Sequence, residues 1–139
     1  MTQAMIRKVL GAVGLLFAAY FPIAITLKNS YDPLGGGPPG TVWRLVYFQK
    51  AENSGHAFTN LTRVLREVSD TQEYPERSPV ILYEDDKPLG PAHSNHSDIS
   101  RLGLGRFSHW GTLGFFVSTS DNSDPRTNGR KYWAVVPVR

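Results

Sequence analysis

The sequence predicts a mainly β protein in which a single transmembrane α-helix precedes an antiparallel β-sandwich. Two observations support this prediction. Residues 9–27 form an apolar run of about 19 residues without a charged side chain, and about 20 such residues span a bilayer core. The rest of the chain contains short β-branched and aromatic segments separated by turn residues, without long helices between them. This pattern favours a jelly roll, with an immunoglobulin-like sandwich as the alternative.

The apolar run is predicted to be a retained membrane anchor over residues 1–29. A cleaved signal peptide is the alternative, but its apolar part is usually about 7–15 residues long and ends at a small-x-small site. The nearest such site, Ala24-Ile25-Thr26, has Thr in place of the last small residue. The length of the run and this unsuitable site therefore favour the anchor.

Basic residues near the ends of the run predict its orientation. Arg7 and Lys8 precede it, whereas Lys28 and the more distant Arg44 follow it. Basic residues are enriched on the cytoplasmic side of membrane helices. We therefore expect a single-pass protein of the bacterial inner membrane, with a cytoplasmic N-terminus and a periplasmic C-terminal domain.

Residues 30–40 are rich in Gly and Pro and are predicted to form a linker. Three consecutive glycines give flexibility, while Pro38 and Pro39 favour an extended chain. Residues 41–139 number about 100, which is enough for one domain with one core. We expect this domain to be the β-sandwich.

Alternation of apolar residues and turn signals predicts the elements of this domain in order. The expected strands are 41–49, 56–59, 78–84, 88–90, 106–110, 113–119 and 130–138. A short helix or irregular segment is expected over 61–68, and one or two helical turns over 97–102. For these turns Ser94 or Ser97 is the expected N-cap and Gly103 the stop.

The polar connection 120–129 is expected to be an ordered structural loop. Its Asp and Asn side chains can bond nearby backbone groups, and Arg126 and Arg130 lie close enough in sequence to pair with the loop carboxylates. We also expect the loop to contact residues 109–110. The predicted structural residues of this region are His93, His96, His109, Asp121, Asn122, Asp124 and Asn128.

Three motifs carry a family resemblance: LYEDDKPLGPAHS at 82–94, GRFSHWG at 105–111 and STSDNSDPRTNGR at 118–130. Together they resemble an uncharacterised bacterial β-rich module, sandwich-like or jelly-roll-like, that is appended to cell-surface and glycan-related proteins. The resemblance covers roughly the last 60 residues and implies a fold and a binding role. At Asp86 the module would have Gly, and Asp tolerates positive φ better than most residues.

Two groups of side chains contain residue types that bind metals. His93, His96 and His109 with Asp98 contain zinc-ligand types, but no second carboxylate stands at a suitable spacing. We expect these histidines instead to brace a loop through bonds to backbone groups. Asp121 and Asp124 are calcium candidates, although Pro125 interrupts the ligand pattern and no Glu closes it. The prediction is therefore no metal and no cofactor.

Composition and motifs also bear on the class of activity. The net charge is only +3, and the basic residues are scattered between acids, which argues against nucleic-acid binding. The sequence shows no nucleophile elbow, phosphate loop or cofactor fingerprint. We therefore predict a protein that is not an enzyme, and a hydrolase is the least favoured alternative.

The remaining signal is a group of aromatic and arginine side chains suited to an interface or a sugar platform. The candidate binding residues are Trp43, Trp110, Trp133, Tyr132, Arg126 and Arg130, and at least one of Trp110 and Trp133 is expected to be exposed or at a contact. The leading hypothesis is an accessory subunit docked on the extracytoplasmic face of a larger membrane complex, of photosynthetic reaction-centre or respiratory type. Its partners would be integral membrane subunits and the lipid bilayer. The alternative is a membrane-tethered carbohydrate-binding domain with a glycan partner.

Overall fold

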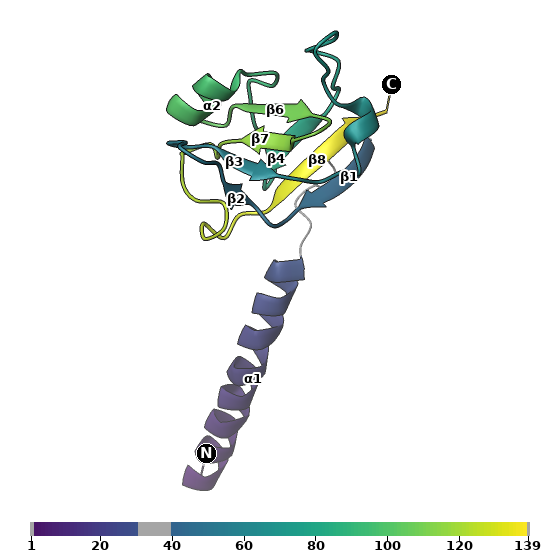
Figure 1. Ribbon diagram of the computed structural model, residues 1–139. Helices are drawn as coiled ribbons and strands as arrows, with labels where there is room; N and C mark the ends of the chain where they lie inside the picture. Colours follow the sequence, from purple (N-terminus) through teal and green to yellow (C-terminus); the bar gives the residue numbers. More distant parts are fainter. Residues whose placement is uncertain (1, 31–39, 139) are drawn as a thin grey trace. The chain divides into compact units, whose positions relative to one another are not determined.

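The computed structural model describes residues 2–30 and 40–138, which fall into an N-terminal helical unit and a C-terminal β unit (Figure 1). Ser30 is the last residue of the helix and Gly40 the first of a strand. The rest of the predicted linker, residues 31–39, lies outside the described residues.

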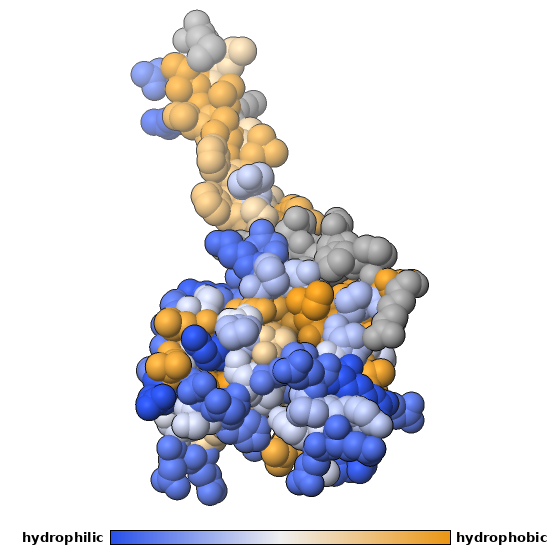
Figure 2. Space-filling view, turned by 90° about the horizontal axis from the view of Figure 1, so that it is seen from above, coloured by the Kyte–Doolittle hydropathy of each residue, from blue (hydrophilic) through white to orange (hydrophobic). Residues whose placement is uncertain are grey.

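The N-terminal unit is one helix, α1 (Gln3–Ser30). Its stretch Gln3–Leu27 is long and apolar enough to cross a membrane, and none of its most apolar window is buried within the structure. At 1.5 Å per residue this stretch is about 38 Å long, against a hydrocarbon core of about 30 Å. In the space-filling view α1 is predominantly hydrophobic, whereas the visible face of the β unit is mainly hydrophilic with separate hydrophobic patches (Figure 2).

The β unit contains two antiparallel sheets, with the strand orders β1-β8-β4-β5 and β2-β3-β7-β6. The strands are β1 (Gly40–Leu45), β2 (Gln49–Lys50), β3 (Phe58–Asn60), β4 (Ile81–Glu84), β5 (Lys87–Pro88), β6 (Phe107–Trp110), β7 (Gly114–Val117) and β8 (Tyr132–Pro137). The mainly β prediction is thus confirmed. Within the described residues, neither sheet places three consecutive strands side by side, so this order lends no support to a Greek-key arrangement.

One hydrophobic core takes side chains from both sheets. On β7, Phe115 and Val117 point into it, and on β8, Tyr132 and Ala134 do so. These pairs are two residues apart, which is the spacing of one face of a strand. The remaining buried members are Leu45, Phe48, Phe58, Leu65, Val80, Leu82, Leu89 and Phe107.

A short helix, α2 (His96–Arg101), packs against the second sheet. The His96 ring stacks on Phe116 at 4.3 Å between ring centroids, and Phe116 alternates with the core residues of β7. The N-cap of α2 is Asn95, whose side chain accepts a hydrogen bond from the Asp98 amide at 2.8 Å. The predicted caps Ser94 and Ser97 are wrong by one and two positions, because Asn caps a helix as well as Ser does.

The predicted strand 41–49 is interrupted. β1 ends at Leu45 in the first sheet, and β2 begins at Gln49 in the second. Between them Tyr47 has φ 62°, a left-handed conformation that is unusual for a bulky residue. The chain therefore turns a corner at Tyr47 and passes from one sheet to the other.

The hairpin between β4 and β5 also differs from the expectation. Positive φ falls on Asp85, at 54°, and not on Asp86. The Asp85 carboxylate accepts a hydrogen bond from the Lys131 amide at 2.8 Å, which ties the turn to the residue before β8. The predicted segment 61–68 is largely irregular, with one 3-10 turn, η1 (Arg66–Val68).

Candidate functional site

The loop 120–129 and the residue after it are organised around Glu84, at the end of β4. Glu84 is only 6% exposed. Its carboxylate accepts hydrogen bonds from the Tyr132 hydroxyl at 2.8 Å, from Arg130 Nη1 at 3.2 Å and from the Ser120 hydroxyl. Glu84 was a possible calcium ligand by residue type, but the sequence did not predict its hydrogen bonds to these partners, because it lies more than thirty positions from them.

Both calcium candidates bind arginine. Arg130 Nη2 lies 2.6 Å from Asp121, and Arg126 Nη2 lies 2.6 Å from Asp124. The predicted ion pairs are thus confirmed. Hydrogen bonds from Arg130, followed by those from Ser123, hold the pKa of Asp121 well below its usual range. The Asp121 and Asp124 carboxylates each form an ion pair with an arginine of the same region, so their oxygens already have cationic partners.

Asparagine side chains complete the loop. Asn122 Oδ1 accepts a hydrogen bond from the Leu104 amide at 2.7 Å, and Asn128 Nδ2 donates to the Tyr132 hydroxyl at 2.8 Å. Burial raises the pKa of Tyr132 above its ordinary value, and the hydrogen bond from Asn128 opposes this rise. The contact expected with residues 109–110 was wrong, because the loop leaves β7 beside Phe107 whereas Trp110 lies at the opposite end of β6.

A second polar group lies in the interior. It consists of Asp70, Ser78, His93 and His109, and we call it the Asp70 cluster. The Asp70 carboxylate lies 2.8 Å from His93 Nδ1 and accepts a hydrogen bond from the Ser78 amide at 2.7 Å. The Ser78 hydroxyl shares a 2.8 Å hydrogen bond with His109 Nδ1. These histidines bond side chains where backbone groups were expected, and His96 lies apart from them.

The Asp70 cluster is closed to a substrate at its Ser–His pair. His109 is 1% exposed and stacks on Phe115 at 4.2 Å, and Ser78 is buried. Burial, opposed by the charge of Asp70, lowers the pKa of His109 to about 4. A hydrolase needs an accessible nucleophile beside its base, so this geometry gives the hydrolase alternative no support.

Beside the cluster lies a hollow of about 560 Å³, which we call the Trp110 hollow. It is bordered by the turn that carries Asp70 and by the segment that follows β6. Trp110 itself is half-buried. Sequence reasoning identified Trp110 but missed the other lining residues, which are Arg66, Ser69, Asp70, Thr71, Gln72, Gly111, Thr112 and Leu113.

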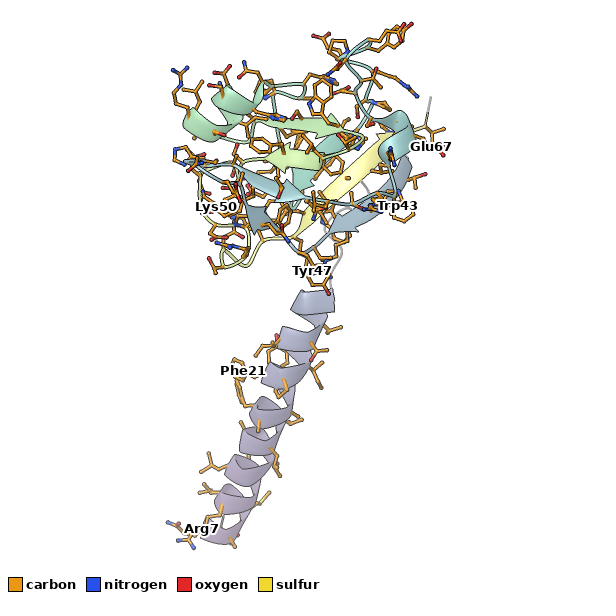
Figure 3. The ribbon with its side chains drawn as sticks, in the orientation of Figure 1. Arg7, Phe21, Trp43, Tyr47, Lys50 and Glu67 are labelled. Carbon is orange, nitrogen blue, oxygen red and sulfur yellow. The ribbon has the colours of Figure 1, made fainter. Side chains whose placement is uncertain are left out.

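The corner between β1 and β2 forms the third region, the Tyr47 surface, defined as Arg44, Val46, Tyr47 and Leu61. These residues border one shallow hollow. Tyr47 is 91% exposed, and its side chain projects from the corner (Figure 3). Val46 and Leu61 are 46% and 59% exposed. The surface therefore combines an aromatic ring, two aliphatic side chains and one guanidinium group.

The other predicted binding residues have different surroundings. Trp43 lies on the edge strand β1 and is 38% exposed, whereas Trp133 and Tyr132 are buried. The Arg44 guanidinium lies over the Trp133 ring at 5.8 Å. Arg126 lies over Phe58 at 5.5 Å. The predicted binding residues Arg126 and Arg130 both pair with carboxylates of the domain's own loop.

Comparisons with protein-family models, with curated proteins and with solved structures found no match to this chain. The candidate sites are therefore argued from the structure of this chain. In the loop around Glu84 the charged side chains pair with one another. The Trp110 hollow and the Tyr47 surface instead have exposed side chains that an external molecule can contact.

Proposed function

We propose that the protein is a non-catalytic, single-pass membrane-anchored subunit whose β domain binds an integral membrane partner on the periplasmic side. In this proposal α1 is retained as the anchor, the two sheets pack as a sandwich, and the Tyr47 surface is the contact region. The length and apolar character of α1 support the anchor.

The conformation of Tyr47 is the observation that carries this proposal. A bulky residue in the left-handed region costs of order 1–3 kcal/mol. Within the described residues Tyr47 makes no side-chain hydrogen bond and no ring contact, and nearly all of its surface faces outward. The fold thus holds an aromatic side chain outward in an unfavourable conformation without an internal contact that offsets the cost, which is typical of a residue selected for binding.

α1 supplies a second contact. Gly11 and Gly14 have no atom within 4 Å of the position a Cβ would occupy. Gly14 and Ala18 are four residues apart, which is the spacing of small residues that lets helices approach closely in a membrane. α1 and the Tyr47 surface are therefore two candidate contacts with the same membrane complex.

Replacing Tyr47 with Asn tests the proposal. We expect Tyr47→Asn to raise the free energy of unfolding of the β domain by about 0.5–1 kcal/mol, because Asn adopts positive φ at lower cost. In mild detergent, however, a smaller fraction of the variant than of the wild-type chain should migrate with a larger complex, because α1 remains as the second contact. Thermal unfolding and native gel electrophoresis of the full chain give the two readouts.

Tyr74→Asn is the matched control. Tyr74 is also exposed, at 57%, but is not among the residues with positive φ. Its replacement should leave both stability and co-migration unchanged. The proposal is wrong if Tyr47→Asn stays in the complex as fully as the wild-type chain, or if Tyr74→Asn is lost from it equally.

A further inference from the structure

The Trp110 hollow has the size and lining of a small-molecule site. Its volume of about 560 Å³ lies within the roughly 300–1,000 Å³ of typical ligand pockets. One half-buried indole contributes apolar surface, and the exposed side chains of Gln72 and Thr112 contribute polar groups. A flat apolar ring beside donors and acceptors suits the C–H face and hydroxyl groups of a sugar.

The wall that carries Trp110 is held in place by backbone contacts. Asp70 forms an isolated parallel bridge with Trp110, and its amide donates to the His109 carbonyl at 2.8 Å. Gly111 packs so closely that an added Cβ would lie 2.8 Å from Ser69 Oγ. The indole therefore stands on a backbone that is fixed before a ligand arrives, which reduces the entropy lost on binding.

The buried Asp70 cluster lies behind this wall. Burying a carboxylate and a histidine in a small core is unfavourable unless their hydrogen bonds are made. Here those bonds join three segments of the chain, through Asp70, Ser78 and His109. Polar support of this kind fixes the groups in front of it, and Asp70 is itself one of the hollow's lining residues.

Arg66 contributes a positively charged side chain to the lining of the hollow. Its guanidinium makes no hydrogen bond or ion pair with any side chain in the part of the chain that the structure describes, whereas the neighbouring Asp70 carboxylate is already bound by His93 and by the Ser78 amide. Asp70 is only 2% exposed and its oxygens have internal partners, so Arg66 is the exposed charged side chain that the hollow offers to a ligand. A guanidinium group favours planar anions such as carboxylates, which it binds through two hydrogen bonds.

We propose that the Trp110 hollow binds an acidic sugar, a pyranose that carries a carboxylate. The pyranose ring stacks on Trp110, the carboxylate pairs with Arg66, and hydroxyl groups bond Gln72 and Thr112. This site goes beyond the proposed subunit function, because the Tyr47 surface contributes none of its residues.

Calorimetric titration of the full chain in lipid nanodiscs tests the site, with digalacturonate as the acidic probe and cellobiose as the neutral one. We expect saturable binding of digalacturonate and at least tenfold weaker binding of cellobiose. Arg66→Gln should weaken digalacturonate binding roughly tenfold, the effect of losing a charged hydrogen bond. Trp110→Ala should abolish binding of both probes, and Trp110→Phe should keep most of it.

Arg63→Gln is the matched control, since Arg63 is exposed three residues before Arg66 but does not line the hollow. It should change affinity less than twofold. Equal affinity for the two probes, absence of saturable digalacturonate binding, or an equal loss in Arg63→Gln would each overturn the proposal. Because Arg66 is exposed, Arg66→Gln should leave the folded β domain intact, so a loss of digalacturonate affinity in this variant reports on binding.

Discussion

Replacing Arg130 with methionine is expected to lower the free energy of unfolding of the β domain by about 3 kcal/mol. Arg130 bridges the buried Glu84 and the loop residue Asp121. Methionine keeps the apolar stem but removes the guanidinium, which leaves the Glu84 carboxylate buried without its cation. Losing one partner of a buried ion pair typically costs about 3–5 kcal/mol, and the partial exposure of Arg130 places the value at the lower end. Urea unfolding of the full chain measures it.

Arg126→Met is the control for that experiment. Arg126 pairs with Asp124 in the same loop, but both side chains are substantially exposed, so the expected loss of stability is much smaller than in Arg130→Met. Adding Glu84→Gln to Arg130→Met should recover part of the stability, because the double variant has no unpaired buried charge. Equal losses in the two arginine variants would show that the Glu84 network does not organise the loop.

Acidification from pH 7 to pH 5 is expected to lower the free energy of unfolding by about 2 kcal/mol through His109 alone. The folded chain keeps the His109 ring neutral down to a pKa of about 4, whereas the unfolded chain binds a proton near the ordinary value of 6.5. Between these values the unfolded state holds more protons. Stability is therefore complete above about pH 6.5 and is lost as the pH falls towards 4.

His109→Gln should remove this contribution while the carboxylates continue to titrate. The measurement is the difference between wild type and variant in unfolding free energy at pH 7, 6 and 5. A wild-type slope that persists unchanged in the variant would show that another group causes the acid sensitivity.

The fold class was predictable because it rests on local patterns. The apolar run is long enough to identify α1, and alternating β-branched residues identify most strands. The break at Tyr47 was not predictable, because the residues from Val42 to Phe48 read as one continuous strand and no Gly or Asn marks the left-handed turn. Tertiary packing of two sheets imposes that corner.

The candidate sites divide in the same way. Arg126 and Arg130 lie near their carboxylates in sequence, so spacing alone predicted these pairs. The Asp70 cluster joins residues 23 and 31 positions apart, and no local pattern connects them. Arg66 likewise reaches the Trp110 hollow only because the turn before Asp70 folds against the end of β6.

Native mass spectrometry of the membrane-extracted protein in mild detergent tests the central claim most directly. The account predicts the uncleaved chain, with α1 intact, in a complex with a larger integral membrane protein. A lone chain whose mature sequence starts near Lys28 would contradict both the anchor and the subunit function.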